Sequence, residues 1–308
     1  MFVDEMYREA YNLKYWRIFP SFPSFFLLPG FGLRPTLTTS PYLTDSVFDS
    51  EDPKQMSDYL DNGIELCQRL GAKYLLVKTR IPSHRAVLEK RFNIPDAYVT
   101  TILNLEPGED GVWKRVHSKV RNQIRKGLAS SPILEWGRED KIADFYEVFA
   151  RTQTELGTPV HSKRLFSAIL RHHPAARFVV AYHDARPVAG ALTLIHHQVL
   201  YHPYAGTLKA YRRTSVNNVL YWEMIKYGIA NGCTVFDMGR SFVDSGNAMY
   251  KRSWGGNEVP LFYAYFLNGN SRPPDLTSRR FKVLTTLWRA MPVGLAEVIG
   301  PPLIKRVP

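Results

Sequence analysis

The chain has 308 residues, which is enough for one large domain or two of ordinary size. Hydrophobic residues make up 45% of it and charged residues 22%, a composition that excludes wholesale disorder. The net charge of +12 is uneven, since residues 1–110 carry 12 basic and 15 acidic side chains (−3) and residues 111–308 carry 28 and 13 (+15). The later part therefore attracts anions such as phosphates, acidic lipids or nucleic acid.

The two cysteines, Cys67 and Cys233, exclude a disulfide scaffold and a cysteine-rich zinc site. Both lie in hydrophobic surroundings, so we expect core thiols in a reducing compartment. Residues 1–10 carry three acids and no apolar core, unlike a secretory signal. Residues 19–33 are too short and too rich in proline to span a bilayer. We expect a cytoplasmic protein that contacts the inner face of the membrane at most peripherally.

In chain order, apolar residues at helical spacing before Gly71 predict a helix over residues 59–70. Short apolar or β-branched runs predict strands over 74–77 and 98–105. The segment 106–111, EPGEDG, has the composition of a linker, and the charge balance changes sign there. We therefore place a first domain over residues 1–110.

Residues 113–126 have an apolar stripe at helical spacing and are predicted to form one helix that ends at Gly127. Its other positions hold six cations and no acid: Lys114, Arg115, Lys119, Arg121, Arg125 and Lys126. These cations either face water alone or bind a phosphate-bearing partner. Because six unneutralised charges repel one another, the pattern favours the phosphate partner.

The following elements predict an α/β fold with a mixed sheet. After two helices the apolar period changes to that of a three-strand meander, and a further helix and two short strands come next. In order, they are helices over 138–156 and 161–171, strands over 178–182, 188–195 and 199–204, a helix over 216–230, and strands over 234–236 and 261–266. We place the second domain over residues 111–270.

The densest polar cluster is the segment 236–256, which follows a short buried strand. Asp237 is expected at the carboxyl end of that strand, where ligands bind in open α/β sheets. The segment also supplies cations, hydroxyl groups and an aromatic ring, at Arg240, Lys251, Ser241, Ser245 and Trp254. It is either a binding site or a well-capped surface loop. No metal site is expected, because the histidine doublets place neighbouring side chains on opposite faces of a strand.

Several motifs in this order resemble the Fem family of aminoacyl and acyl transferases. They are Gly157-Thr158-Pro159-Val160, Pro203-Tyr204-Ala205-Gly206, Asn218 with Tyr221-Trp222, Phe236-Asp237-Met238-Gly239-Arg240-Ser241, Asp244-Ser245-Gly246, Tyr250-Lys251 and Trp254-Gly255. The resemblance covers roughly residues 40–268 and is nearest to the FemAB-like branch associated with exopolysaccharide and exosortase systems. It implies two domains of the GNAT (GCN5-related N-acetyltransferase) fold. Because residues 1–110 are short for a whole domain, we expect a partial first copy.

The resemblance implies transfer of an acyl or aminoacyl group to an amine of a cell-envelope or exopolysaccharide precursor. The donor would be acyl-CoA or aminoacyl-tRNA, and the acceptor a lipid-linked or saccharide amine. The usual pyrophosphate loop of acetyltransferases is absent before residue 216, and Lys209, Arg212 and Arg213 take its place. A phosphate can bind at such a helix N-terminus.

We assign provisional roles to these residues. Lys251 and Arg240 would place positive charge near a phosphate or the developing oxyanion. Asp237 would orient Arg240 or the amine, or act as base, and Tyr204 would donate a hydrogen bond. Substrate contacts are expected from Ser241, Ser245 and Trp254, and phosphate contacts from Lys119, Arg125, Lys209, Arg212 and Arg213.

Residues 271–308 form a basic tail that contains an apolar segment over 287–299 with Trp288. This segment either lies in an anionic membrane interface or packs back on the second domain. A different function stays open: a non-catalytic scaffold with a degenerate acyltransferase fold that binds nucleic acid or a membrane surface.

Overall fold

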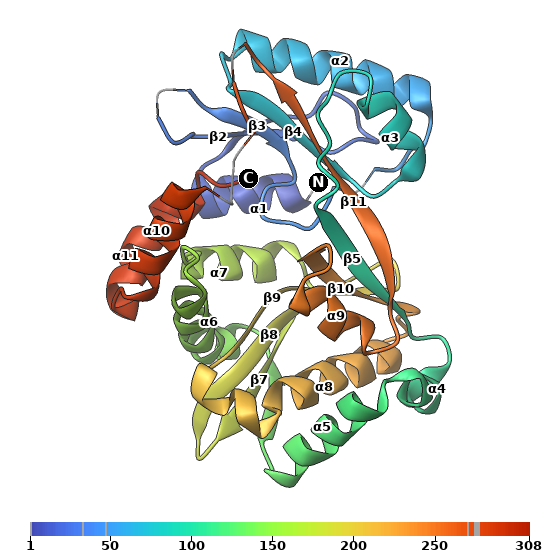
Figure 1. The fold of residues 1–308 in the computed structure, drawn as a ribbon, viewed down its shortest axis with the longest axis vertical. Coiled ribbons are helices and arrows are strands. Elements are labelled where there is room, and N and C mark those ends of the chain that lie inside the picture. The colour runs from blue at the N-terminus through green and yellow to red at the C-terminus, as the bar shows by residue number, and fades with distance from the viewer. Residues whose placement is uncertain (1, 33, 47, 270, 274–277) are drawn as a thin grey trace.

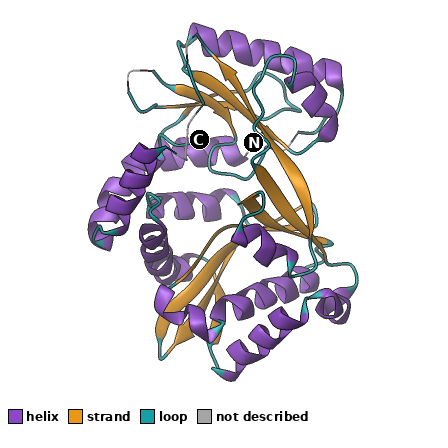
Figure 2. Cartoon of the chain, viewed as in Figure 1, coloured by secondary structure: helices purple, strands orange, loops and turns teal. Residues whose placement is uncertain are grey.

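The computed structural model describes residues 2–32, 34–46, 48–269, 271–273 and 278–308. The described strands form one mixed sheet in the order β1-β2-β3-β4-β11-β5-β10-β9-β8-β7-β6. Figures 1 and 2 show this sheet running the length of the molecule with helices on both sides. The strands are β1 Lys14–Trp16, β2 Phe25–Leu28, β3 Thr36–Thr39, β4 Tyr74–Thr79, β5 Tyr98–Asn104, β6 Ile133–Gly137, β7 Arg177–His183, β8 Arg186–His196, β9 Val199–Thr207, β10 Val235–Phe242 and β11 Asn257–Leu267. The α-helices are α1 Phe2–Tyr11, α2 Pro53–Arg69, α3 Pro82–Leu88, α4 Gly108–Arg115, α5 Ser118–Ala129, α6 Ile142–Leu156, α7 Lys163–His172, α8 Val216–Ala230, α9 Gly246–Arg252, α10 Arg279–Arg289 and α11 Val293–Ile304.

The first half of the chain packs α2 and α3 against strands β1 to β4. Helix α2 begins where the Asp52 side chain accepts a hydrogen bond from the Lys54 amide at 2.9 Å and Pro53 occupies the first turn. Its apolar face, which includes Tyr59 and Leu66, joins a buried cluster with β4. Every residue of β4 is buried, as expected for a strand covered on both faces.

The second half covers the strands β6 to β10 on both faces. Helices α6 and α7 share one buried cluster with β7 to β9 and with α1. Helices α4, α5 and α8 share a second cluster with β5 and β10 on the opposite face. Helix α6 ends at Gly157, whose φ of 78° needs the left-handed conformation that glycine adopts without strain. The helices and the meander predicted between residues 138 and 230 are confirmed.

Strand β11 joins the two halves. Its residues 257–261 pair with β5, and its residues 262–267 pair with β4 of the first half. Strand β5 in turn pairs with β10. Figure 1 shows β5 and β11 as the long strands between the two groups of helices. The polypeptide before residue 110 and that after it therefore share one continuous sheet.

Three sequence predictions differ from the structure. The helix predicted over 113–126 is two helices, α4 and α5, that meet at Val116 and His117, where the His117 side chain caps α5. The predicted linker 106–111 already contains the first turn of α4. The strand predicted over 234–236 extends as β10 to Phe242, because its later residues pair with β5 across a bulge.

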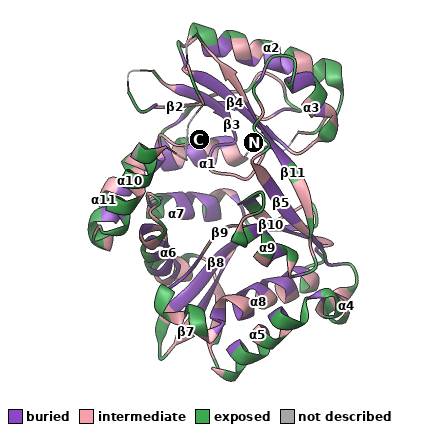
Figure 3. Cartoon of the chain, in the orientation of Figure 1, coloured by how far each residue is buried: buried purple, intermediate pink, exposed green. Residues whose placement is uncertain are grey.

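The described part of the tail, 271–273 and 278–308, packs on the second half through α10 and α11, which both contact α6. Trp288, Ala296 and Ile304 belong to the same buried cluster as α6 and α7. Other side chains of α10 and α11 remain exposed, as Figure 3 shows. None of the described helices is both long enough and apolar enough to cross a membrane.

Candidate active site

A cavity forms where the parallel strands β9 and β10 diverge. They pair only from Val235–Asp237 to Val199–Tyr201. Beyond Asp237 a bulge shifts the register of β10 with β5, and Gly239 takes a φ of 75°. Strand β9 continues to Thr207 alone on that side. The cavity has a volume of about 330 Å³ and uses residues of both strands.

Both halves of the chain line this cavity. The first half contributes the loop after β3 and the end of β4, and the second half contributes β8, β9 and β10. The lining includes Asp45, Phe48, Arg80, Ile81, Leu194, His196, Tyr201, His202, Pro203, Asp237 and Gly239. Asp237 is the one residue of the predicted catalytic set, Lys251, Arg240, Asp237 and Tyr204, that lines it.

Asp237 is almost fully buried and accepts three hydrogen bonds. They come from Thr100 Oγ1 at 2.5 Å, from Arg80 Nη2 at 2.6 Å and from the Gly239 amide at 2.9 Å. Arg80 also donates to both carboxylate oxygens of Asp45, at 2.5 and 2.7 Å. One guanidinium thus joins two carboxylates from opposite halves. The expected pairing of Asp237 with Arg240 is wrong, because Arg80 occupies that position.

The carboxyl of Asp45 is the more accessible of the two, with a side chain that is 14% exposed against 1% for Asp237. Burial raises the pKa of Asp45 above its ordinary value, against the opposing effect of the Arg80 guanidinium. Asp45 therefore holds a proton more readily than a carboxyl in water does. Two carboxylates and one guanidinium leave a net negative charge at the cavity wall, which favours a cationic ligand such as an amine.

His202 lines the same cavity, and neither of its buried ring nitrogens has a hydrogen-bond partner of normal geometry. Burial, assisted by the nearby Lys251, lowers the pKa of His202 to about 3, so the ring is neutral at pH 7. A neutral imidazole offers one donor and one acceptor to a ligand. His202 lies 35 positions and Arg80 157 positions from Asp237, and Asp45 lies 35 positions from Arg80, so no sequence signal linked these residues to one site.

Lys251 lies behind the cavity wall and not on it. Its Nζ donates to the carbonyl oxygens of Gly239 at 2.7 Å and Arg240 at 3.1 Å, which lie at the bulge of β10. Burial lowers its pKa to about 8. The predicted contact of Lys251 with a phosphate or oxyanion is replaced by this support of the bulge.

Arg240 is exposed and is linked to the loop that carries Asp45 through Tyr263. Its guanidinium lies over the rings of Tyr98 and Tyr263, and its Nη1 donates to the Tyr263 hydroxyl at 3.2 Å. That hydroxyl donates to the carbonyl oxygen of Thr44. Arg240 therefore positions the segment that carries Asp45, and it is a positioning residue in this structure.

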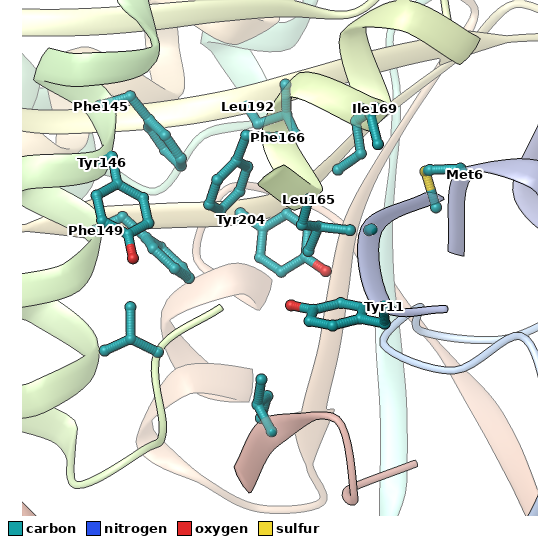
Figure 4. Close-up of a cluster of buried hydrophobic side chains, with 14 of the residues drawn as sticks. Met6, Tyr11, Phe145, Tyr146, Phe149, Leu165, Phe166, Ile169, Leu192 and Tyr204 are labelled. Carbon is teal, nitrogen blue, oxygen red and sulfur yellow. The ribbon is translucent and has the colours of Figure 1, made fainter. Parts of the chain in front are cut away.

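Tyr204 is buried among aromatic side chains away from the cavity. Its ring packs edge-on against Phe149, Phe166 and His161, and Figure 4 shows it within this cluster beside Tyr11. Burial raises its pKa well above the ordinary value. The predicted hydrogen bond from Tyr204 to substrate does not fit this position.

The remaining predicted residues of the segment 236–256 support helix α9. Ser245 caps α9 by accepting from the Ala248 amide at 3.2 Å, and Ser241 accepts from Asn247 Nδ2 at 3.1 Å. Trp254 is fully buried and stacks on Tyr221 with ring centroids 5.6 Å apart. Trp254 is thus a core residue, and the substrate contact predicted for it is wrong.

A second group of candidate residues lies on the outer surface near the start of α8. Gly127 of α5 faces Val219 and the Ser215 carbonyl, so the end of α5 lies against the first turn of α8. Arg125 is exposed near that end of α5, and Lys209, Arg212 and Arg213 are exposed in the 3₁₀ turn Lys209–Thr214 just before α8. Lys119 is also exposed but lies six residues back along α5, about 9 Å away. We refer to these cations together as the basic surface; within it the Arg125 guanidinium lies over the Trp113 ring, and Arg212 lies 3.7 Å from the carboxylate of Glu155.

Comparisons with known proteins place the fold. Residues 114–252 match the family profile described as "Acetyltransferase (GNAT) domain". The fold is a GNAT fold. No curated protein sequence matches the chain significantly.

Solved structures resemble the chain over most of its length. FemX has a TM-score of 0.66 at 13% identity and covers 87% of this chain and 94% of its own. L-PGS from Bacillus licheniformis has a TM-score of 0.59 at 10% identity, with 94% and 93% covered. The tandem GNAT protein from the clavulanic acid biosynthesis pathway has a TM-score of 0.52 at 12% identity, with 82% and 80% covered. The prediction of a mixed α/β GNAT fold is confirmed, and the last likeness is consistent with a second GNAT-like unit in the first half.

Proposed function

We propose that the chain transfers an acyl or aminoacyl group to an amine of a cell-envelope or exopolysaccharide precursor. The observation that carries the proposal is the cavity at the divergence of β9 and β10 with the Asp45–Arg80–Asp237 group on its wall. The GNAT fold, the match of residues 114–252 and the likeness to FemX support acyl transfer as the general chemistry.

In the proposed reaction, Asp45 holds the ammonium form of the acceptor and takes up its proton, while Asp237 and Arg80 fix the Asp45 carboxylate. The free amine nitrogen then attacks the carbonyl carbon of the donor, and the bond from that carbon to sulfur or oxygen breaks. The proton held by Asp45 passes to the leaving group, and the second proton lost from the nitrogen as the amide forms is taken up by the freed Asp45 carboxylate and released to water. Positioning of the amine supplies much of the rate enhancement in such a reaction. His202 can hydrogen-bond the acceptor from the opposite strand.

The donor is proposed to lie along β9 and to reach the outer basic surface. Beyond Tyr201 the edge of β9 no longer pairs with β10, so an extended donor arm can add to it as a strand would. The phosphates of acyl-CoA or aminoacyl-tRNA would then meet Arg125, Arg212 and Arg213 near the start of α8. Lys119 would be reached only by a donor large enough to extend along α5, such as tRNA.

Carboxylate substitutions test the reaction. Asp45→Asn is expected to lower kcat/KM about 10²- to 10³-fold, because the proton acceptor is lost. The control is Asp244→Asn, an exposed carboxylate outside the cavity whose left-handed backbone suits asparagine. Acylated envelope precursors are measured by mass spectrometry in cells that express each form. Product formation by Asp45→Asn at the level of the control would exclude the proposed role, and absence of any product with the wild-type chain would favour the non-catalytic scaffold.

Charge reversal at the basic surface tests the donor. Arg125→Glu with Arg212→Glu is expected to weaken binding of both CoA and tRNA. For tRNA the logarithmic salt dependence should also flatten by about one unit for each lost phosphate contact. Lys119→Glu should weaken the binding of tRNA and leave the binding of CoA unchanged. Equal salt-independent binding by all forms would show that these cations only face water.

A further inference from the structure

The outward face of α10 is apolar although α10 is packed on the protein. Val283, Leu284 and Leu287 are 51%, 64% and 63% exposed. They are spaced three and four residues apart, which places them together on one face of a helix. Single exposed leucines are common, but a row on one face is not explained by chance exposure.

The inward face of the same helix is a different set of residues. Trp288 is buried in the cluster shared with α6 and α7. Thr285 and Arg289 lie against Gly157 at the end of α6, so closely that a Cβ on that glycine would be 2.4 Å from Thr285 Cγ2. The contacts of Thr285, Trp288 and Arg289 fix the rotation of α10. The apolar row is therefore held outward by packing.

The charged side chains of α10 itself have one sign. Arg279 and Lys282 are exposed in the first turns of α10, and α10 contains no acidic residue. Helix α11 adds two exposed apolar side chains, Leu295 at 47% and Val298 at 72%. An apolar face bordered by cations complements the boundary between the headgroups and acyl chains of an anionic bilayer.

We propose that the α10 face, Arg279, Lys282, Val283, Leu284 and Leu287, docks the protein on the surface of an anionic membrane. The helix lies in the interface and does not span it, in agreement with its eleven residues. Trp288 and the α6 contacts stay packed on the protein, so docking needs no unfolding of the tail. This inference does not depend on acyl transfer.

Co-sedimentation with vesicles tests the proposal. The full-length protein is mixed with vesicles of phosphatidylglycerol and phosphatidylcholine in equal parts, or of phosphatidylcholine alone. We expect binding to the first kind, and Leu284→Ser with Leu287→Ser should lower the partition coefficient at least about tenfold. Arg279→Glu with Lys282→Glu should abolish the preference for anionic vesicles.

The matched control is Leu128→Ser with Ile133→Ser, which removes two exposed apolar side chains, of 51% and 61% exposure, from α5 and β6. All variants should keep the wild-type melting temperature, because each altered side chain is exposed. Equal binding by the Leu284/Leu287 variant and the wild type overturns the proposal, as does loss of binding in the control. A wild-type dimer that the Leu284/Leu287 variant converts to a monomer would assign the face to a second copy of the chain and also overturn it.

Discussion

Arg80 holds together a pair of carboxylates that would otherwise repel each other. Asp45 and Asp237 come from opposite halves of the chain, and each is within 2.7 Å of the Arg80 guanidinium. Removal of Asp237 leaves a balanced pair of Asp45 and Arg80. Removal of Arg80 leaves two carboxylates without their common cation. Substitution of Arg80 should therefore lower the free energy of unfolding more than substitution of Asp237 does.

We expect Arg80→Met to lower the free energy of unfolding by about 3–5 kcal/mol at pH 7, and Asp237→Asn by about 1–2 kcal/mol. Urea denaturation measures both. The difference in free energy of unfolding between the wild type and Arg80→Met should become smaller as the pH falls. Burial and the neighbouring Asp237 charge raise the pKa of Asp45, and Arg80→Met removes the cation that opposes this shift, so Asp45 takes up a proton more readily in the folded variant than in the unfolded chain and acid stabilises the folded variant. Equal losses of free energy of unfolding in the two variants would contradict the interpretation that Asp45 and Asp237 share the Arg80 guanidinium.

Lys78 is a second buried charge, beneath the loop that carries Asp45. Its Nζ lies 3.4 Å from the carbonyl oxygens of Ser40 and Leu43 and 5.4 Å from the centre of the Tyr263 ring, and burial lowers its pKa to about 7. Between pH 7 and about 10.5 the unfolded chain holds this proton and the folded chain does not, so stability rises with pH across that interval. Lys78→Met should therefore be more stable than the wild type at pH 7, and the difference should shrink as the pH approaches 10.5. A constant difference across this interval would show that Lys78 keeps its charge when folded.

Elements with a long regular pattern could be predicted from the sequence, and elements defined by a cap or a partner could not. The apolar pattern of α6 and of the meander β7 to β9 repeats over many residues and was sufficient to predict these elements. The break between α4 and α5 depends on the His117 cap and on Arg121, which donates to the carbonyls of Trp113, Lys114 and Val116. The apolar stripe of Trp113, Val116, Val120 and Ile124 continues through the break, so the sequence alone favoured one helix.

The same limit applies to the site. Asp237 was found because it follows the apolar run 234–236, although β10 continues past it, whereas Arg80 and Asp45 reach it only when β11 pairs with both β4 and β5. Lys251 and Trp254 belong to a polar, glycine-rich segment that resembles a binding loop. Their side chains turn inward, to the carbonyls of the bulge and to the ring of Tyr221, a direction that composition does not reveal.

Packing between α5 and α8 supports the basic surface and can be tested with one methyl group. A Cβ on Gly127 would lie 2.5 Å from Val219 Cγ2 and 2.8 Å from the Ser215 carbonyl oxygen. Gly127→Ala should therefore move the two helices apart and destabilise the protein by about 1–3 kcal/mol. The control is Gly246→Ala on α9, where a Cβ would meet nothing within 4 Å. The melting temperatures of both variants are measured by thermal unfolding. An unchanged melting temperature in Gly127→Ala would show that α5 is not held against α8.

On the scale of the whole molecule, the two halves share structure in three places. Strand β11 pairs with strands of both, the Asp45–Arg80–Asp237 group crosses between them, and α1 lies in one buried cluster with α6, α7 and the tail. Independent domains would each have their own core and few contacts across the boundary. We therefore expect the chain to unfold in a single cooperative transition.

Calorimetry of the wild type and of Trp288→Ala tests this expectation. The wild type should show one transition whose calorimetric enthalpy equals its van't Hoff enthalpy. Trp288 is 8% exposed in the shared cluster, so its truncation should cost about 3–5 kcal/mol. The whole transition should move to lower temperature, including the signal from the first half, although Trp288 packs on the second. The opposite outcome is two separated transitions, of which Trp288→Ala lowers the temperature of only the one from the second half. It would mean that β11 and the buried charges do not couple the unfolding of the two halves. The candidate active site, which uses residues of both halves, would then lie at a weak interface.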